Sequence, residues 1–198
     1  MSPEIFLSLL AFAFVTSITP GPNNLMLLSS GVNFGFRRTI PHMLGIGIGF
    51  VVLLLAVGAG LGALVSAVPW LFPAIKITGG AYLLYLAWHI ATGAPPEAET
   101  AGSSKSLSFT AAAIFQWVNP KAWIMAITAM ATYTKAGEYW VTMVLVAATF
   151  GVVNLPCISS WVGLGITLRT WLNDRRRLAI FNTVMALTLV ASLWPMLH

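Results

Sequence analysis

The sequence predicts an all-α, polytopic membrane protein with six transmembrane helices, the first and fourth of which are broken. Of the 198 residues, 58% are hydrophobic and only 8% are charged, whereas about 25% of the residues of a soluble domain are charged. Apolar stretches of about 20 residues, the length that spans the hydrocarbon core of a bilayer, recur six times along the chain. Prolines interrupt two of these stretches, at residues 19–24 (TPGPNN) and 118–121 (VNPK).

The six expected spans cover residues 4–27, 42–66, 71–93, 109–133, 139–166 and 178–197. The first apolar stretch continues weakly to Phe36, which is too long for one straight crossing unless the helix breaks or tilts. Residues 94–108 contain two prolines, two glutamates and a Gly-Ser-Ser-Lys stretch, a composition typical of a linker. We therefore expect one transmembrane domain, 1–198, whose halves 1–93 and 109–198 each hold three spans.

The distribution of lysine and arginine orients the spans. The connections that follow spans one, three and five are rich in basic residues, namely Arg37, Arg38, Lys105, Arg169, Arg175, Arg176 and Arg177. The opposite connections hold only Lys135 and Lys76. Because cytoplasmic loops are enriched in basic residues, we expect the first set and the 94–108 linker to be cytoplasmic and both termini to be periplasmic. Three spans per half is an odd number, so the second half is inverted relative to the first, which gives a three-plus-three inverted repeat.

The two proline breaks are the strongest pointer to function. Proline lacks the backbone N–H donor and clashes with the preceding turn, so each break leaves backbone groups unpaired. In a bilayer this is tolerated only where protein or a polar cavity surrounds the break. Broken helices at corresponding positions of two halves mark the midplane substrate site of transporters. We expect hinges at both breaks and at a third proline in span five, at Pro20, Gly21, Pro22, Pro120 and Pro156.

Both breaks are followed by the start of a new half-helix. In residues 119–121, Asn119 is a good N-cap and Pro120 is favoured at the first helical position. We expect Thr19 to cap the other half-helix in the same way. If both half-helix N-termini face one cavity, their free N–H groups and partial positive charge favour an anionic group such as a carboxylate.

Lys121 lies about midway along the fourth span, between Phe109 and Tyr133. A lysine inside a span costs roughly 2.5–3.5 kcal/mol on insertion scales, so it normally faces a cavity or a partner. All of the acidic residues lie at span ends or in connections, which leaves a substrate carboxylate or a backbone carbonyl as the partner. Snorkelling of the side chain to the membrane interface is the alternative.

Further polar residues near the breaks complete the expected substrate site. Asn154 precedes Pro156, which we expect to interrupt span five. Single amides in spans commonly form helix–helix hydrogen bonds, whereas polar groups beside broken helices also bind substrates, and both interpretations stay open. The candidate substrate-binding residues are Thr19, Asn23, Asn24, Gln116, Asn119, Lys121 and Asn154.

Other classes of function find little support in the sequence. The single cysteine, Cys157, excludes an intramolecular disulfide and a Cys-X-X-Cys redox pair. His42 and His89 lie at span ends without partners at metal-ligand spacing, so we expect no metal, no cofactor and no enzyme activity. His42 remains a candidate titrating group. The basic residues form no face interleaved with aromatic side chains, so we expect no nucleic-acid partner.

Small residues in span two, at the pairs Gly45/Gly49 and Gly58/Gly62, allow close contact between helices. Packing within the monomer is the favoured interpretation, and a homodimer is the alternative. Tryptophans near span ends are expected to anchor the chain in membrane lipid; they are Trp70, Trp88, Trp140 and Trp171.

Several motifs taken together point to a known family. They are Thr19-Pro20-Gly21-Pro22-Asn23, Gly35-Phe36-Arg37, Gly79-Gly80-Ala81-Tyr82-Leu83 and Asn119-Pro120-Lys121-Ala122. With this combination the chain resembles, over essentially its whole length, the LysE/RhtB family of bacterial inner-membrane amino-acid exporters. Residues 23–24, 86–92 and 116–119 look most similar to the cysteine/O-acetylserine exporter branch of that family.

The resemblance implies a secondary transporter that exports small amino acids or their derivatives from the cytoplasm to the periplasm, driven by the proton motive force. Asn23 is a departure, since many family members look to carry Asp at this position. The departure removes a carboxylate able to bind a cationic substrate or relay a proton. A six-helix channel, or a carrier for another small polar solute, is the alternative, because half-helix N-termini also line channels.

Overall fold

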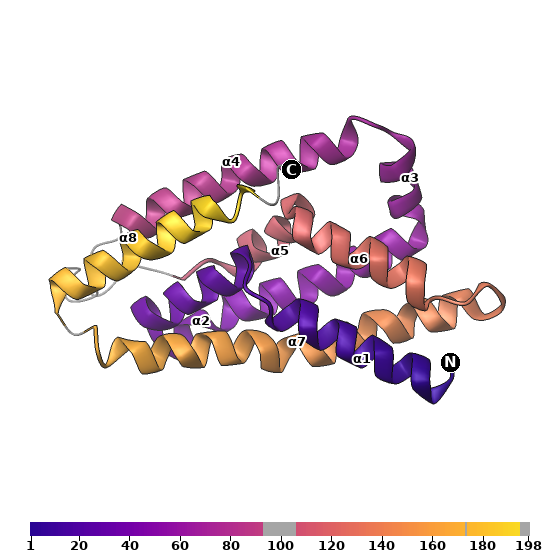
Figure 1. The fold of residues 1–198 in the computed structure, drawn as a ribbon, viewed down its shortest axis with the longest axis horizontal. Helices are drawn as coiled ribbons and strands as arrows, with labels where there is room; N and C mark the ends of the chain where they lie inside the picture. The colour runs from indigo at the N-terminus through magenta and orange to yellow at the C-terminus, as the bar shows by residue number, and fades with distance from the viewer. Residues whose placement is uncertain (93–105, 173, 195–198) are drawn as a thin grey trace.

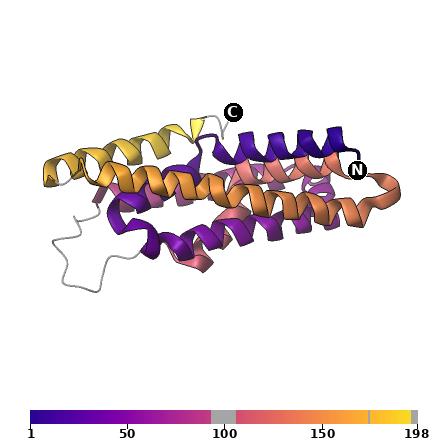
Figure 2. The same cartoon turned by 90° about the horizontal axis from the view of Figure 1, so that it is seen from below.

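The computed structural model describes residues 1–92, 106–172 and 174–194, and this part of the chain is helical with no strand (Figure 1). Figure 2 shows most of the helices running along the long axis of the molecule. The helices in chain order are α1 (Pro3–Ile18), α2 (Pro22–Ala56), η1 (Val57–Leu61), α3 (Gly62–Ala67), α4 (Leu71–Thr92), α5 (Phe109–Val118), α6 (Pro120–Tyr133), η2 (Ala136–Glu138), α7 (Tyr139–Arg169) and α8 (Arg175–Ala191).

Among the described residues, three helical stretches are long and apolar enough to cross a membrane, at Pro22–Ala67, Leu71–Thr92 and Ala136–Arg169. Pro3–Ile18 and Phe109–Val118 are apolar but shorter, because each ends at a break. The expected all-α, multi-pass membrane character is thereby confirmed. Most of the linker expected at 94–108, including Lys105, and the end of the sixth span lie outside the described residues.

The helix is interrupted at both expected positions. Helix α1 ends at Ile18 and α2 begins at Pro22, while α5 ends at Val118 and α6 begins at Pro120. Each new helix carries proline in its first turn, where the missing N–H has no intrahelical partner to lose. The expected interruption at Pro156 is wrong, because this residue lies inside the continuous helix α7.

The connection expected between spans one and two is a sharp bend inside α2 rather than a loop. The bend lies at Gly35, whose φ of 76° is the left-handed conformation that residues with a Cβ rarely adopt. A helical pattern continues on both sides of this single residue, so hydropathy alone gives no clear boundary. A Cβ at Gly35 would lie 3.4 Å from Nη1 of Arg169, which places the bend beside the end of α7.

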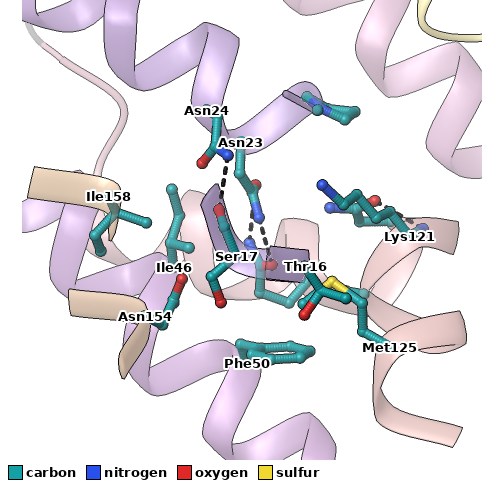
Figure 3. A pocket seen from close by; sticks show the side chains of 15 residues that line it. Thr16, Ser17, Asn23, Asn24, Ile46, Phe50, Lys121, Met125, Asn154 and Ile158 are labelled. Atoms are coloured by element: carbon teal, nitrogen blue, oxygen red, sulfur yellow. Dashed lines mark hydrogen bonds between the residues drawn. The ribbon is translucent and has the colours of Figure 1, made fainter. Parts of the chain in front are cut away.

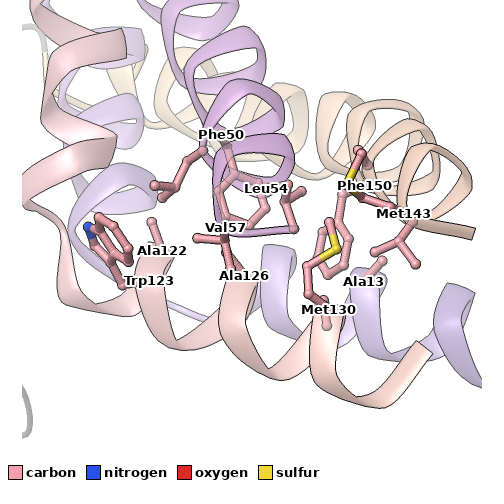
Figure 4. Close-up of a cluster of buried hydrophobic side chains, with 14 of the residues drawn as sticks. Ala13, Phe50, Leu54, Val57, Ala122, Trp123, Ala126, Met130, Met143 and Phe150 are labelled. Carbon is pink, nitrogen blue, oxygen red and sulfur yellow. The ribbon is translucent and has the colours of Figure 1, made fainter. Parts of the chain in front are cut away.

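The core forms where α2 packs along α7 and α4 packs along α8 (Figure 1). The largest cluster of buried apolar side chains joins α1, α2, α6 and α7 (Figure 4). Within it, Phe150 makes edge-to-face contacts with Phe12 and Phe50. Gly45 and Gly49 pack against the α5 backbone, where a Cβ would clash with Phe109 and Ala113. The favoured interpretation of these two glycines, packing within the monomer, is therefore confirmed.

Candidate functional site

A partly open pocket lies where the two helix breaks meet (Figure 3). Polar side chains from α1, α2, α5, α6 and α7 line it together with an apolar wall. Six of the seven candidate substrate-binding residues lie in this lining, namely Asn23, Asn24, Gln116, Asn119, Lys121 and Asn154. Gly21 and Pro22 also line the pocket, whereas Thr19, Pro20, Pro120 and Pro156 are not among its lining residues.

Lys121 joins the two breaks directly. Its Nζ donates a hydrogen bond of 2.8 Å to the carbonyl oxygen of Thr19, which is the residue after the end of α1. In the part of the chain that the structure describes, no acidic side chain pairs with this ammonium group. The sequence left a substrate carboxylate and a backbone carbonyl open as partners of Lys121, and in the structure the partner is the backbone carbonyl.

Gly21 makes room for the lysine side chain. A Cβ at this position would lie 3.0 Å from both Cδ and Nζ of Lys121, closer than ordinary van der Waals contact allows. The backbone at Gly21 is extended, with φ of −172°, so space rather than conformation is what the glycine provides. The first break thus accommodates the charged group that comes from the second break.

The free carbonyl groups at the end of α1 are satisfied by side chains from other helices. Nδ2 of Asn24 donates to the carbonyl oxygens of Ser17 and Thr19, both at 2.9 Å. Nε1 of Trp161, in α7, donates to the carbonyl oxygen of Ile18 at 3.1 Å. Since the last carbonyls of a helix have no intrahelical partner, these contacts fix the position of the broken end. The amide nitrogen of Asn24 therefore stabilises the end of α1.

The N-termini after the two breaks differ. Oδ1 of Asn119 accepts a hydrogen bond of 3.1 Å from the backbone N–H of Lys121, so the expected cap of α6 is confirmed. The expected capping role of Thr19 is wrong, because its hydroxyl donates back to the carbonyl oxygen of Val15 within α1. Gly21 is the N-cap of α2 and offers no side chain. The N–H groups in the first turn of α2 therefore keep their capacity to bind an anion.

Asn23 and Gln116 form a reciprocal pair of amides across the pocket wall. Nδ2 of Asn23 donates to Oε1 of Gln116 at 2.9 Å, and Nε2 of Gln116 donates to Oδ1 of Asn23 at 3.3 Å. Gln116 is fully buried and its Nε2 also donates to the carbonyl oxygen of Ala112. The pair ties the start of α2 to the end of α5, so the two halves of the chain are connected beside both breaks.

Two further polar residues, Thr16 and Ser17 in α1, line the pocket and were not among the candidates. The Thr16 hydroxyl donates to the carbonyl oxygen of Phe12, whereas the Ser17 hydroxyl is buried without a partner among the described residues. Their position in the last turn before the first break was the available signal. The apolar wall comes from Ile46, Phe50, Met125 and Ile158.

The charge of the pocket lining is positive, because Lys121 is its charged residue and no carboxylate accompanies it. No group of metal-ligating side chains occurs within the described ranges. His42 is buried in α2 and does not line the pocket. The arrangement can bind a small solute that carries one anionic group and further hydrogen-bonding groups.

Comparisons with known proteins identify the family of the chain. The family model described as LysE type translocator matches residues 14–191. The "Cysteine/O-acetylserine efflux protein" of Escherichia coli strain K12 is 31% identical over 195 residues, which cover 96% of each chain. The protein of the same name from Shigella sonnei strain Ss046 is similar to the same extent. No solved structure matches the chain at a significant level.

Proposed function

This chain belongs to the LysE family of translocators. We propose that it exports small zwitterionic amino acids from the cell and binds them in the pocket between its two helix breaks. The protein is a multi-pass inner-membrane amino-acid exporter and not an enzyme. The main support for this site is the hydrogen bond from Nζ of Lys121 to the carbonyl oxygen of Thr19 at the pocket.

In this proposal Lys121 binds the substrate carboxylate. A charged hydrogen bond to a carboxylate is roughly twice as strong as one to a neutral carbonyl, so a carboxylate that enters the pocket competes well for the ammonium group. The uncapped start of α2 adds N–H donors and the positive end of a helix dipole on the same side. Asn119 holds α6 in place and thereby positions Lys121.

In the same proposal, the substrate ammonium group binds to the carbonyl groups at the first break. Helix α1 ends there with the carbonyl groups of residues 17–19, the negative end of its dipole. A carbonyl oxygen has two lone pairs, so the carbonyls of Ser17 and Ile18, which each accept from one side chain, retain acceptor capacity beside Asn24 and Trp161. One break therefore offers complementary charge for both ends of a zwitterion. The names of the relatives support a small, polar amino acid or derivative as the cargo.

The topology that fits this function is a single domain of six spans arranged as an inverted three-plus-three repeat. Helix α1 with the first part of α2, and α5 with α6, would be the two broken spans. The bend in α2, the end of α7 and the start of α8 lie at one end of the molecule, and the N-terminus lies at the other (Figure 1). With the arginine-rich end in the cytoplasm, both termini are periplasmic and residues 94–108 are cytoplasmic. A homodimer remains compatible with this arrangement.

Transport would proceed by alternating access with bending at residues 20–22 and at Pro120, where the helices are already interrupted. Energy would come from the proton motive force, although the pocket lining holds no carboxylate to relay protons. The amide pair of Asn23 and Gln116 and the Lys121 contact cross between the two halves, so they would have to exchange partners as the halves move.

The experiment is efflux from proteoliposomes that contain the purified protein and are preloaded with a mixture of small amino acids, with and without an imposed pH gradient. Selective, saturable and gradient-sensitive loss of small polar amino acids is the expected result. Unselective loss that does not saturate would indicate a channel instead. No loss of any amino acid from vesicles that contain folded protein would contradict the proposed function.

A further inference from the structure

Two polar side chains that line the pocket have no hydrogen-bond partner among the described residues. The Ser17 hydroxyl is buried and unpaired, and Ser17 is 5% exposed. Asn154 is 7% exposed, and none of the hydrogen bonds of the described residues involves its amide. The other polar side chains of the lining are all engaged, namely those of Thr16, Asn23, Asn24, Gln116, Asn119 and Lys121.

The unpaired hydroxyl of Ser17 is unusual, because more than nine-tenths of buried polar groups in proteins are hydrogen-bonded. Ser17 comes from α1 and Asn154 from α7, so their presence in one pocket is a property of the tertiary fold. In a helix interior, a serine or threonine hydroxyl can donate to a carbonyl oxygen of the preceding turn. The hydroxyl of Thr16 does so, whereas the hydroxyl of Ser17 does not.

The two side chains lie away from the charged group of the pocket. Figure 3 shows Lys121 and Asn154 on opposite sides of the pocket, with Ser17 between them and Ile46, Phe50 and Ile158 around Asn154. A substrate held by its carboxylate at Lys121 would therefore direct its side chain, rather than its α-ammonium group, toward Ser17 and Asn154. The surrounding apolar residues limit the length of that side chain.

We propose that Ser17 and Asn154 form a specificity subsite that recognises a hydrogen-bonding group on a short substrate side chain. The inference rests on the proposed function, since it assumes that Lys121 holds the carboxylate. A hydroxyl both donates and accepts, and an amide does the same through different atoms. The pair can therefore match a hydroxyl or carbonyl oxygen of the substrate, whereas a methyl group would leave both residues unpaired. Sites of this kind discriminate strongly against the analogue that lacks the polar group.

The test compares serine with 2-aminobutyrate, in which a methyl group replaces the hydroxyl. Both retain the carboxylate and the ammonium group, so the ratio of their apparent affinities as competitors of transport in proteoliposomes reports the side-chain subsite alone. We expect the wild-type protein to prefer serine by about tenfold or more. Ser17→Ala and Asn154→Leu, each measured alone, should lower this ratio toward one by weakening serine and strengthening 2-aminobutyrate.

Ser159→Ala is the matched control, because its hydroxyl is bonded to the carbonyl oxygen of Leu155 within α7 and does not line the pocket. The control should keep the wild-type ratio. Ser17→Ala removes an unpaired atom and should fold as well as the wild type, so it keeps the test decisive if Asn154→Leu does not fold.

The outcomes separate the two proposals. A wild-type protein that transports both compounds with equal affinity contradicts the subsite alone, and so do variants that weaken both compounds equally. The latter result would assign the two residues to the backbone of the substrate. A wild-type protein that binds neither compound contradicts the proposed function, and the subsite with it.

Discussion

The ammonium nitrogen of Lys121 lies 2.8 Å from the carbonyl oxygen of Thr19, although 102 residues separate them in the chain. The contact connects the two helix breaks, one from each half of the sequence, at the edge of a shared pocket. A carbonyl is a weaker partner for an ammonium group than a carboxylate is. The contact is therefore suited to exchange when a substrate carboxylate arrives.

Replacing Lys121 by alanine should reduce efflux of a small amino acid about 10- to 100-fold, because a hydrogen bond to a charged group contributes roughly 1.5–3 kcal/mol. The measurement is the initial rate of efflux from proteoliposomes with matched protein content. Lys135→Ala is the control, since Lys135 is exposed in the connection before η2 and should be dispensable. Normal efflux by Lys121→Ala would rule out its role in binding.

Gly21→Ala should weaken transport several-fold without changing the thermal unfolding of the protein. The new Cβ would lie 3.0 Å from Nζ of Lys121, and the flexible lysine would yield rather than the backbone. Gly47→Ala is the control, because a Cβ at Gly47 meets nothing within 4 Å. An unchanged apparent KM for Gly21→Ala would show that the position of the ammonium group is not critical.

Asn119→Ala should lower the stability of the protein by about 1 kcal/mol, the usual cost of losing an N-cap. The reason is that Oδ1 of Asn119 accepts from the N–H of Lys121 at the start of α6. Thermal unfolding in detergent measures the effect. Asn119→Asp retains the accepting oxygen and should recover most of the loss, whereas equal loss in both variants would assign the residue another role.

Gly79→Ala should destabilise the protein by about 1–3 kcal/mol, the range for overpacking. A Cβ at Gly79 in α4 would overlap the carbonyl oxygen of Val118, at the second break. Gly163→Ala, where a Cβ meets nothing within 4 Å, should be neutral or mildly stabilising. If both variants unfold at the same temperature, α4 does not approach the break closely.

The helix breaks and the cap of α6 could be predicted because proline and asparagine act locally on the backbone. The prediction that Thr19 caps α2 is wrong, because its hydroxyl donates to the preceding turn of α1 rather than accepting from α2. Pro156 has the same local chemistry as the other prolines, yet α7 continues through it. In that case tertiary packing along α2 outweighs the loss of one backbone donor.

Ser17 was missed for a different reason. A serine in an apolar helix usually bonds to its own backbone. Its position in the last turn before the first break is a signal in the sequence, but this position does not reveal that its hydroxyl is unpaired. Asn154, which lines the same pocket, follows Ser17 by 137 residues in the sequence. The packing of α1 against α7 brings the two residues to one pocket. Bulk hydropathy indicates which segments enter the membrane, but the pairing of polar groups across helices depends on the full fold.

In the proposed function, Lys121 holds the substrate carboxylate. The most direct test compares serine with serinamide, which lacks the carboxylate, as competitors of transport by the wild-type protein and by Lys121→Ala. We expect the wild type to prefer serine by about tenfold or more, and Lys121→Ala to lose most of this preference because the charged hydrogen bond is gone. Equal affinity of the wild-type protein for serine and serinamide would contradict it.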